Sequence, residues 1–150
     1  MDKVLYKNFY KFKEPITFNI LPALLINHRL NSYLKGFPSE NLIFNGTFHI
    51  REVHHHPLFN EIREKIKKEF NIEGPTDLDI FCSFAPGVSG AVHRDKYEVA
   101  ILSVLGDICY RIDNEKYFLN PGDLIRIKRG HPHQAIGLDP RIVLSFGHGF

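Results

Sequence analysis

Cysteine, tryptophan and methionine are scarce in this sequence. Two cysteines, Cys82 and Cys109, occur among 150 residues, together with one methionine and no tryptophan. Two cysteines are too few for a disulfide framework or for a zinc site built from thiolates. Because both lie in segments of strand-like composition, we expect them to be small buried hydrophobic residues.

Long apolar runs and a strong net charge are also missing. The longest apolar runs, residues 20–26 and 99–105, fall short of the ~20 residues that a membrane-spanning helix needs. The chain opens without a basic segment followed by an apolar one, so we expect a cytoplasmic protein with no membrane partner. The net charge of +2 and the sequence pI near 8.5 neither require nor exclude a nucleic-acid partner.

The residues that are abundant are phenylalanine and histidine. There are 13 phenylalanines and nine histidines. A chain of 150 residues is the size of one domain, 1–150, and it can bury a core without disulfides or a structural metal. The phenylalanines indicate a large core, and the histidines raise the question of a metal site. The conspicuous run at residues 54–56 precedes Pro57 and is expected to be a loop that caps the next helix.

Two segments of the N-terminal half have apolar residues at helical spacing. Residues 19–34 predict a helix that begins near Pro22, and residues 57–70 predict one that begins at Pro57. The second has an apolar face and an opposite face rich in lysine, arginine and glutamate, as expected for a helix on a protein surface.

The remaining N-terminal segments favour β structure. Residues 42–53 are rich in β-forming residues and contain Asn45-Gly46, which predicts a hairpin. Residues 3–13 alternate lysine with aromatic residues, and we expect an edge strand that packs its aromatic rings. A strip that binds single-stranded nucleic acid is the alternative. Residues 1–78 would together buttress the remainder of the domain.

Residues 79–150 contain short β segments separated by glycine, proline and aspartate turns. Eight such segments in about 70 residues predict a mainly β fold with flanking helices, a double-sheet barrel or jelly roll with a mouth where side chains converge. The predicted strands are 80–84, 91–95, 99–104, 108–112, 116–119, 124–128, 131–135 and 142–146.

Two histidines and one aspartate in this region have the chemistry of a metal site. Residues i and i+2 of a strand point to the same face, so His93 and Asp95 should project together. If His133 lies on an adjacent strand, the three form a facial triad that holds non-haem Fe(II) and leaves three coordination positions open. This donor set also suits manganese or nickel.

Residues 80–150 resemble the double-stranded β-helix of the cupin superfamily. The second cupin motif, G-x5-P-x-G-x2-H, fits Gly122, Gly130 and His133, with Lys128 in place of the proline. This spacing favours His133 over His131 as the distal ligand. His131 would share its strand face and would lie in the second shell or at the mouth.

The first cupin motif departs from the pattern in an informative way. Gly87 and His93 fit G-x5-H-x-H, but Asp95 replaces the second histidine. H-x-D followed by a distal histidine resembles the Fe(II)- and 2-oxoglutarate-dependent dioxygenases, including the JmjC-like hydroxylases. The resemblance implies Fe(II) as metal, 2-oxoglutarate as co-substrate and O2 as oxidant.

The same resemblance implies a basic residue that binds the distal carboxylate of 2-oxoglutarate. Arg141 opens the last predicted strand eight residues after His133, and a planar guanidinium binds a carboxylate through two hydrogen bonds. Ser145 would share the strand face of Arg141. Arg111, on an earlier strand, is the alternative anchor because JmjC-like members place the basic residue there.

The function expected from these residues is a dioxygenase, specifically a hydroxylase, that acts on a small molecule or a peptide side chain. Two alternatives stay open: a metal-dependent cupin enzyme that does not use 2-oxoglutarate, and a non-catalytic barrel that binds a small ligand. The sequence does not indicate the substrate or the oligomeric state.

Overall fold

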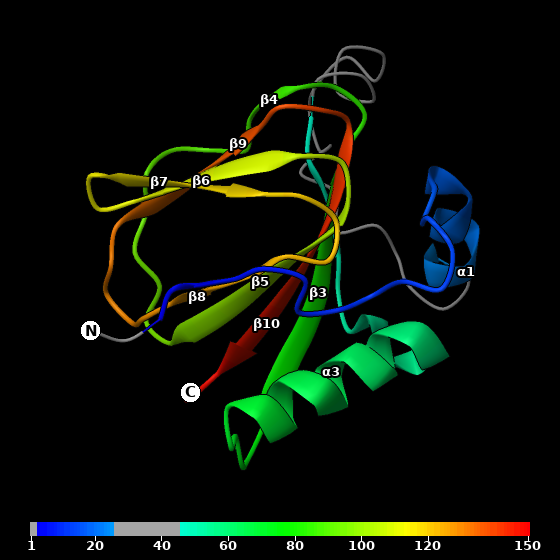
Figure 1. Cartoon of the computed structure of the whole chain (residues 1–150), viewed down its shortest axis with the longest axis horizontal. Helices are drawn as coiled ribbons and strands as arrows, with labels where there is room; N and C mark the ends of the chain where they lie inside the picture. Colours follow the sequence, from blue (N-terminus) through cyan, green and yellow to red (C-terminus); the bar gives the residue numbers. More distant parts are fainter. Residues whose placement is uncertain (1–2, 26–45) are drawn as a thin grey trace.

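Two antiparallel sheets face each other in the computed structural model, which describes residues 3–25 and 46–150 (Figure 1). The larger sheet has the strand order β1-β8-β5-β10-β3-β2, which corresponds to Leu5–Tyr6, Leu124–Ile127, Glu98–Leu105, Arg141–His148, Thr76–Ser83 and Phe48–Ile50. The smaller sheet has the order β4-β9-β6-β7, which corresponds to Gly87–Val88, His133–Gly137, Ile108–Ile112 and Glu115–Leu119. The predicted mainly β fold with flanking helices is confirmed.

The strand predicted at residues 91–95 is wrong. This segment has only an isolated bridge between His93 and His133. Ala91 and Val92 are both exposed, so no buried face holds the segment in a sheet. The strand predicted at 131–135 begins two residues later, at His133, because Pro132 has no N–H to donate to a neighbouring strand.

One face of the larger sheet is covered by helix α3, Pro57–Glu69 (Figure 1). Pro57 occupies the first turn, as predicted, and the buried face of the helix consists of Phe59, Ile62 and Ile66. These side chains pack in one cluster with residues of β3, β5 and β10. The helix predicted at 57–70 is therefore confirmed, with Phe70 as its C-terminal cap.

A second apolar cluster fills the space between the two sheets. It includes Val99 and Ile101 from β5, Tyr110 from β6 and Val143 from β10. Strands β5 and β10 therefore bury both faces, one against the helical layer and one inside the barrel. This explains why residues 99–105 are apolar at every position except Ser103 instead of alternating with polar residues.

The N-terminal segment closes one edge of the larger sheet. Strand β1 pairs with β8, and Phe9 is buried in the first apolar cluster, so the predicted edge strand with packed aromatic rings is confirmed. Lys7 Nζ lies 2.6 Å from a carboxylate oxygen of Asp123, which is 2% exposed.

Between β1 and α3, the described residues form strand β2 and short helical segments. The helical segments are a 3-10 turn at Phe18–Ile20, helix α1 at Leu21–Leu25 and a 3-10 turn at Val53–His55. Helix α1 lies within the predicted helix 19–34, whose residues 26–34 lie outside the described residues, as do residues 42–45 of the predicted hairpin. Residues 54–56 form the turn that leads into α3, as predicted, and His56 is the N-cap residue.

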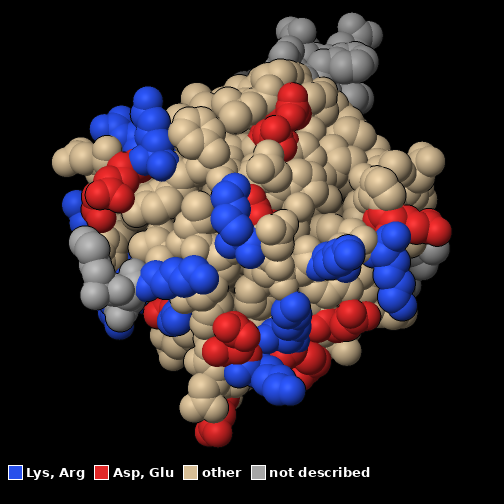
Figure 2. All heavy atoms as spheres, viewed as in Figure 1, with Lys and Arg blue, Asp and Glu red and all other residues tan. Residues whose placement is uncertain are grey.

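Three expectations from the composition can be compared with the structure: the surface charge, the state of the cysteines and the length of the helices. Basic and acidic side chains are interspersed on the face shown in Figure 2, as expected for a net charge of +2. Cys82 and Cys109 are free and buried in strands β3 and β6, as predicted. Within the described residues, none of the helices has the length and apolar character needed to cross a membrane. The assignment of 1–78 and 79–150 to one domain stays a prediction.

Candidate metal centre

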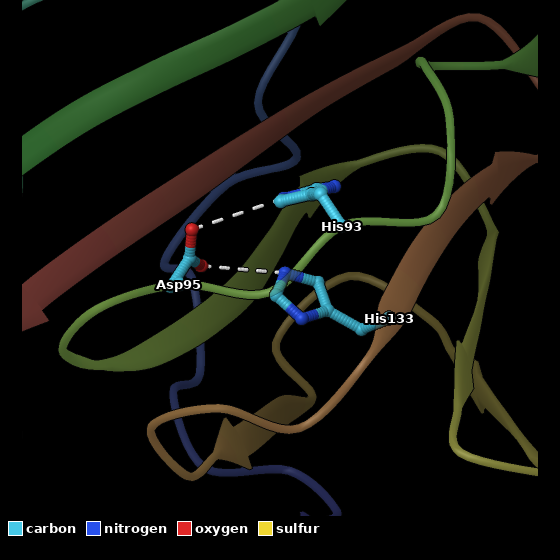
Figure 3. A group of neighbouring side chains, drawn as sticks. All are labelled: His93, Asp95 and His133. Atoms are coloured by element: carbon cyan, nitrogen blue, oxygen red, sulfur yellow. Dashed lines mark ion pairs between the residues drawn. The ribbon is translucent and has the colours of Figure 1, made fainter.

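Three side chains with metal-binding chemistry lie together on the wall of one cavity, with His133 buried, Asp95 half-buried and His93 exposed. One ligand atom from each of His93, Asp95 and His133 lies within 4.8 Å of the other two. The Nε2 atoms of His93 and His133 are 3.9 Å and 3.3 Å from the two carboxylate oxygens of Asp95 (Figure 3). The structure thus brings together the three residues that the sequence singles out.

Different elements position these side chains. His133 is the first residue of β9, whereas His93 and Asp95 lie in the loop between β4 and β5. Two hydrogen bonds join the loop to the strand, from His93 N to His133 O (3.1 Å) and from His133 N to His93 O (2.9 Å). A single bridge therefore replaces the regular strand that the sequence predicts.

Backbone carbonyls fix the orientation of both imidazole rings. Nδ1 of His93 lies 3.1 Å from the carbonyl oxygen of Ala91, and Nδ1 of His133 lies 3.0 Å from that of His131. A carbonyl oxygen only accepts hydrogen bonds, so each Nδ1 donates and carries a proton. In the neutral ring the lone pair then lies on Nε2, which faces the Asp95 carboxylate.

This arrangement directs two nitrogen lone pairs and a carboxylate at one point. A cation shared by the three groups removes the repulsion between them. Two ligands bonded to one ion at about 2.1 Å are at most about 4.2 Å apart, and both separations to Asp95, 3.3 and 3.9 Å, fall below that limit. The donor set of two imidazoles and one carboxylate fits a non-haem Fe(II) site, and the hydrogen-bonded Nδ1 atoms are typical of metal-ligating histidines.

The three side chains line a cavity of about 440 Å³ between the sheets. This volume falls within the range of small-ligand sites, about 300–1,000 Å³. Its walls combine apolar residues of β5, β6 and β10 with a few polar groups. The polar groups are Ser89, Tyr97, Tyr110, Arg141 and Ser145.

Arg141 is the cationic group of this cavity. It opens β10 and is only 3% exposed. Its guanidinium donates to the carbonyl oxygens of Ala85 and Gly87, both at 3.2 Å, and to the hydroxyl of Ser89. These acceptors are uncharged, and no carboxylate forms an ion pair with Arg141 among the residues that the structure describes.

A buried guanidinium without an acidic partner has the character of an anion site. Burial lowers the pKa of Arg141, although Tyr110 and Cys82 partly offset this effect. The group stays protonated because the ordinary pKa of arginine lies far above neutral pH. Its positive charge in a desolvated cavity is best compensated by an anionic ligand.

Two tyrosines of the cavity were not identified from the sequence. Burial raises the pKa of Tyr110 far above its usual value; Arg141 lowers it and Asp95 raises it. Burial also raises the pKa of Tyr97, and Asp95 adds to this effect. Both phenols therefore act as neutral hydrogen-bonding groups at neutral pH. The two-residue alternation along 108–112 places Tyr110 on the inner face, but sequence alone does not show which face is inner.

The other predicted site residues lie in different places. Ser145 lines the cavity on the same strand as Arg141. Arg111 is exposed and is not among the cavity residues, so of the two predicted anchors only Arg141 reaches the site. The exposed ring of His131 pairs with Asp113 (2.8 Å) and lines a separate cavity, whereas its backbone carbonyl accepts the hydrogen bond from Nδ1 of His133.

The fold and part of the sequence are similar to those of known proteins. Residues 80–144 match the family described as a cupin domain. The fold is a double-stranded β-helix, as predicted, and it resembles that of a ribosomal oxygenase.

The solved structures similar to this chain include several of one oxygenase. The ribosomal oxygenase YcfD from Escherichia coli with cobalt and succinic acid has a TM-score of 0.75 and 23% identity over 98% of this chain. The same enzyme with cobalt and 2-oxoglutarate has a TM-score of 0.74 and 22% identity. KdgF from Halomonas sp. has a TM-score of 0.50 and 16% identity over 70% of this chain and 81% of its own.

The match covers nearly all of this chain but only part of YcfD. The chain spans about half of YcfD, 48% in the two structures named. No curated protein sequence matches the chain. At these identities the likeness establishes the fold, and the activity has to be argued from the residues of this chain.

Proposed function

We propose that this protein is an Fe(II)- and 2-oxoglutarate-dependent oxygenase that hydroxylates its substrate. The observation that carries the proposal is the pairing of two groups in one cavity. A His-Asp-His cluster lies in the same cavity as a buried arginine that has no acidic partner among the described residues. A metal-binding end and an anion-binding end together suit a metal-chelating dicarboxylate such as 2-oxoglutarate.

His93, Asp95 and His133 would hold the iron through two nitrogens and one oxygen. Bound iron would supply the redox chemistry, in which O2 and 2-oxoglutarate give succinate and CO2, and one oxygen atom of O2 converts a C–H bond of the substrate to C–OH. The hydrogen bonds from Nδ1 to the carbonyls of Ala91 and His131 keep both imidazoles in the tautomer that presents Nε2.

Arg141 would bind the far carboxylate of 2-oxoglutarate and orient the other end toward the three ligands. Three of its five N–H groups have protein acceptors, in Ala85, Gly87 and Ser89. The remaining donors are available to the co-substrate. Ser145 and Tyr110 line the same cavity and offer neutral hydroxyl groups.

The cavity walls would shield His133 and Arg141 from water, and the substrate would be a small molecule or a peptide side chain. Apolar side chains from β5, β6 and β10 surround the polar groups. The likeness to YcfD supports the proposal at the level of the fold, and the structures of that enzyme contain cobalt with 2-oxoglutarate or succinic acid.

Anaerobic titration of the purified protein with Fe(II) and then 2-oxoglutarate tests the proposal. We expect a visible charge-transfer absorption band on addition of 2-oxoglutarate, and succinate and CO2 after admission of air. Asp95→Ala should abolish both signals because it removes one of three ligands. Asp113→Ala, which removes an exposed carboxylate outside the cavity, should leave both unchanged.

Each other outcome points to a different class of protein. Stoichiometric metal binding without a 2-oxoglutarate band or succinate would contradict the proposal and indicate a cupin enzyme that does not use 2-oxoglutarate. Failure to bind Fe(II), Mn(II) or Ni(II) would indicate a barrel that binds a ligand without metal chemistry.

A further inference from the structure

Gly137 is the last residue of β9 and lies against the guanidinium of Arg141. The inward positions along this strand are His133, then Ala135, and then Gly137. The strand thus runs from the candidate metal ligand to the anion site, a path of about 13 Å at 3.3 Å per residue. Gly137 occupies the anion-binding end.

A side chain at this position would collide with the guanidinium. A Cβ atom added to Gly137 would lie 2.7 Å from Nε of Arg141, and closer still to Cζ and Nη1. All three nearest atoms belong to the arginine side chain, and none belongs to the backbone. The glycine therefore provides the volume that the guanidinium occupies.

Backbone conformation does not explain this glycine. Among the described residues, seven other glycines have positive φ, including Gly106 and Gly122, but Gly137 does not. Gly137 pairs in regular antiparallel register with Ile108 on one side and Gly87 on the other. An alanine could adopt this backbone without strain, so the requirement for glycine is steric.

The segment that follows β3 supplies the hydrogen-bond acceptors of the guanidinium. The carbonyl oxygens of Ala85 and Gly87 and the hydroxyl of Ser89 accept its hydrogen bonds. Because Gly87 also pairs with Gly137, the acceptors and the glycine hold the guanidinium from two sides. Arg141 thus has one packed position.

We propose that Gly137 is a positioning residue that sets the place of the Arg141 guanidinium, and hence the affinity of the cavity for an anionic co-substrate. The part that concerns 2-oxoglutarate rests on the proposed function, whereas the part that concerns the guanidinium does not. Gly137→Ala would displace the charged group without removing it. The guanidinium is the mobile end of a side chain, so the fold can accommodate the change.

The first measurement follows the position of the guanidinium directly. The Nε–Hε NMR signal of Arg141, assigned by its absence in Arg141→Ala, should shift or broaden in Gly137→Ala. Ile136→Val, a conservative change on the neighbouring outward position of β9, should leave the signal unchanged. An unshifted Arg141 signal in Gly137→Ala would overturn the proposal.

The second measurement is the affinity for 2-oxoglutarate in Mn(II)-loaded protein by calorimetry. Gly137→Ala should weaken binding by about tenfold or more, while Mn(II) affinity stays equal to that of the wild type. In a variant that already carries Arg141→Ala, Gly137→Ala should weaken 2-oxoglutarate binding by less than about twofold further, because the guanidinium that it displaces is absent. Equal effects in both backgrounds, or no effect in the wild type, would contradict the proposal.

The two measurements separate the failure of this inference from the failure of the proposed function. A wild-type protein that binds no 2-oxoglutarate refutes the proposed function, and the NMR signal then decides the role of Gly137 alone. A wild-type protein that binds 2-oxoglutarate, with Gly137→Ala indistinguishable from it, refutes only the positioning role.

Discussion

Backbone carbonyls orient the two candidate metal-ligating imidazoles. His133 donates from Nδ1 to the carbonyl of His131, a contact that does not involve the His131 ring. That ring pairs with Asp113 on the surface and lines a separate cavity. The two histidines, which the sequence places on one strand face, therefore have different expected roles.

We predict that His131→Ala changes metal affinity by no more than about twofold, as for ordinary surface substitutions. The reason is that the carbonyl that holds His133 remains in the variant. His133→Ala should weaken binding by at least about 100-fold because it removes a ligand. Calorimetric titration with Mn(II) or Fe(II) measures both, and a large loss in His131→Ala would assign the ligand role to His131.

The second prediction at the residue scale concerns the two candidate anchor arginines. Arg141→Ala should raise the KM for 2-oxoglutarate by about 100-fold, since hydrogen bonds to charged groups contribute about 1.5–3 kcal/mol each. Arg111→Ala should leave it unchanged, because Arg111 is exposed and is not among the cavity residues. Steady-state succinate formation measures both values, and the opposite ranking would show that Arg111 is the anchor.

At the scale of the elements, the loop between β4 and β5 carries two of the candidate metal ligands, although it is not a strand. Its single bridge to His133 is enough to fix His93, and Asp95 follows two residues later. By contrast, helix α3 contributes no cavity residue and acts through burial, with Phe59, Ile62 and Ile66 fully covered. Helix α3 therefore contributes to stability, whereas this loop carries candidate ligands.

We predict that Phe59→Ala lowers the free energy of unfolding by about 3–5 kcal/mol, the usual cost of a large cavity in a core. Phe118→Ala is the matched control, because Phe118 is 56% exposed, and it should change stability by no more than about 0.5 kcal/mol. Urea unfolding followed by circular dichroism measures both. Similar values for the two variants would mean that α3 is not docked on the sheet.

At the scale of the whole molecule, one buried carboxylate connects distant parts of the chain. Asp123 accepts hydrogen bonds from Lys7 Nζ (2.6 Å) and from the backbone N–H groups of Asn8 (2.8 Å) and Asn120 (3.0 Å). Burial alone would raise the pKa of Asp123, but these donors outweigh it and hold the pKa below its ordinary value of 3.8. The carboxylate thereby joins the N-terminal segment to the β7–β8 turn.

The sign of the pH dependence follows from this lowered pKa. The folded state favours the ionised carboxylate, so its contribution to stability is complete above the unfolded pKa, near 3.8. It is lost as the pH falls through the lower folded value. We predict that Asp123→Asn destabilises the metal-free protein at pH 7 by about 1–3 kcal/mol. The difference from the wild type should shrink below about pH 4. Urea unfolding at a series of pH values measures it, and a difference independent of pH would contradict the assignment.

Much of the fold was predictable because its signals are local. Helix α3 and most strands of residues 79–150 follow from periodicity and turn residues, which act over a few neighbours. The segment 91–95 was not predictable in this way. Its composition favours a strand, but Ala91 and Val92 have no partner surface to cover them. Only the packing of the whole chain decides that.

The candidate site likewise has features that the sequence determines and features that the tertiary structure decides. The sequence by itself determined which residues have metal-binding chemistry, because residue type and the spacing of His93, Asp95 and His133 are properties of the chain alone. The tertiary structure decided that Arg141, and not Arg111, enters the cavity, and that His131 turns to Asp113. It also placed Tyr110 and Gly137 beside the arginine. The reason is physical: the direction of a side chain depends on which face of its strand is covered, and that covering comes from residues far away in the sequence.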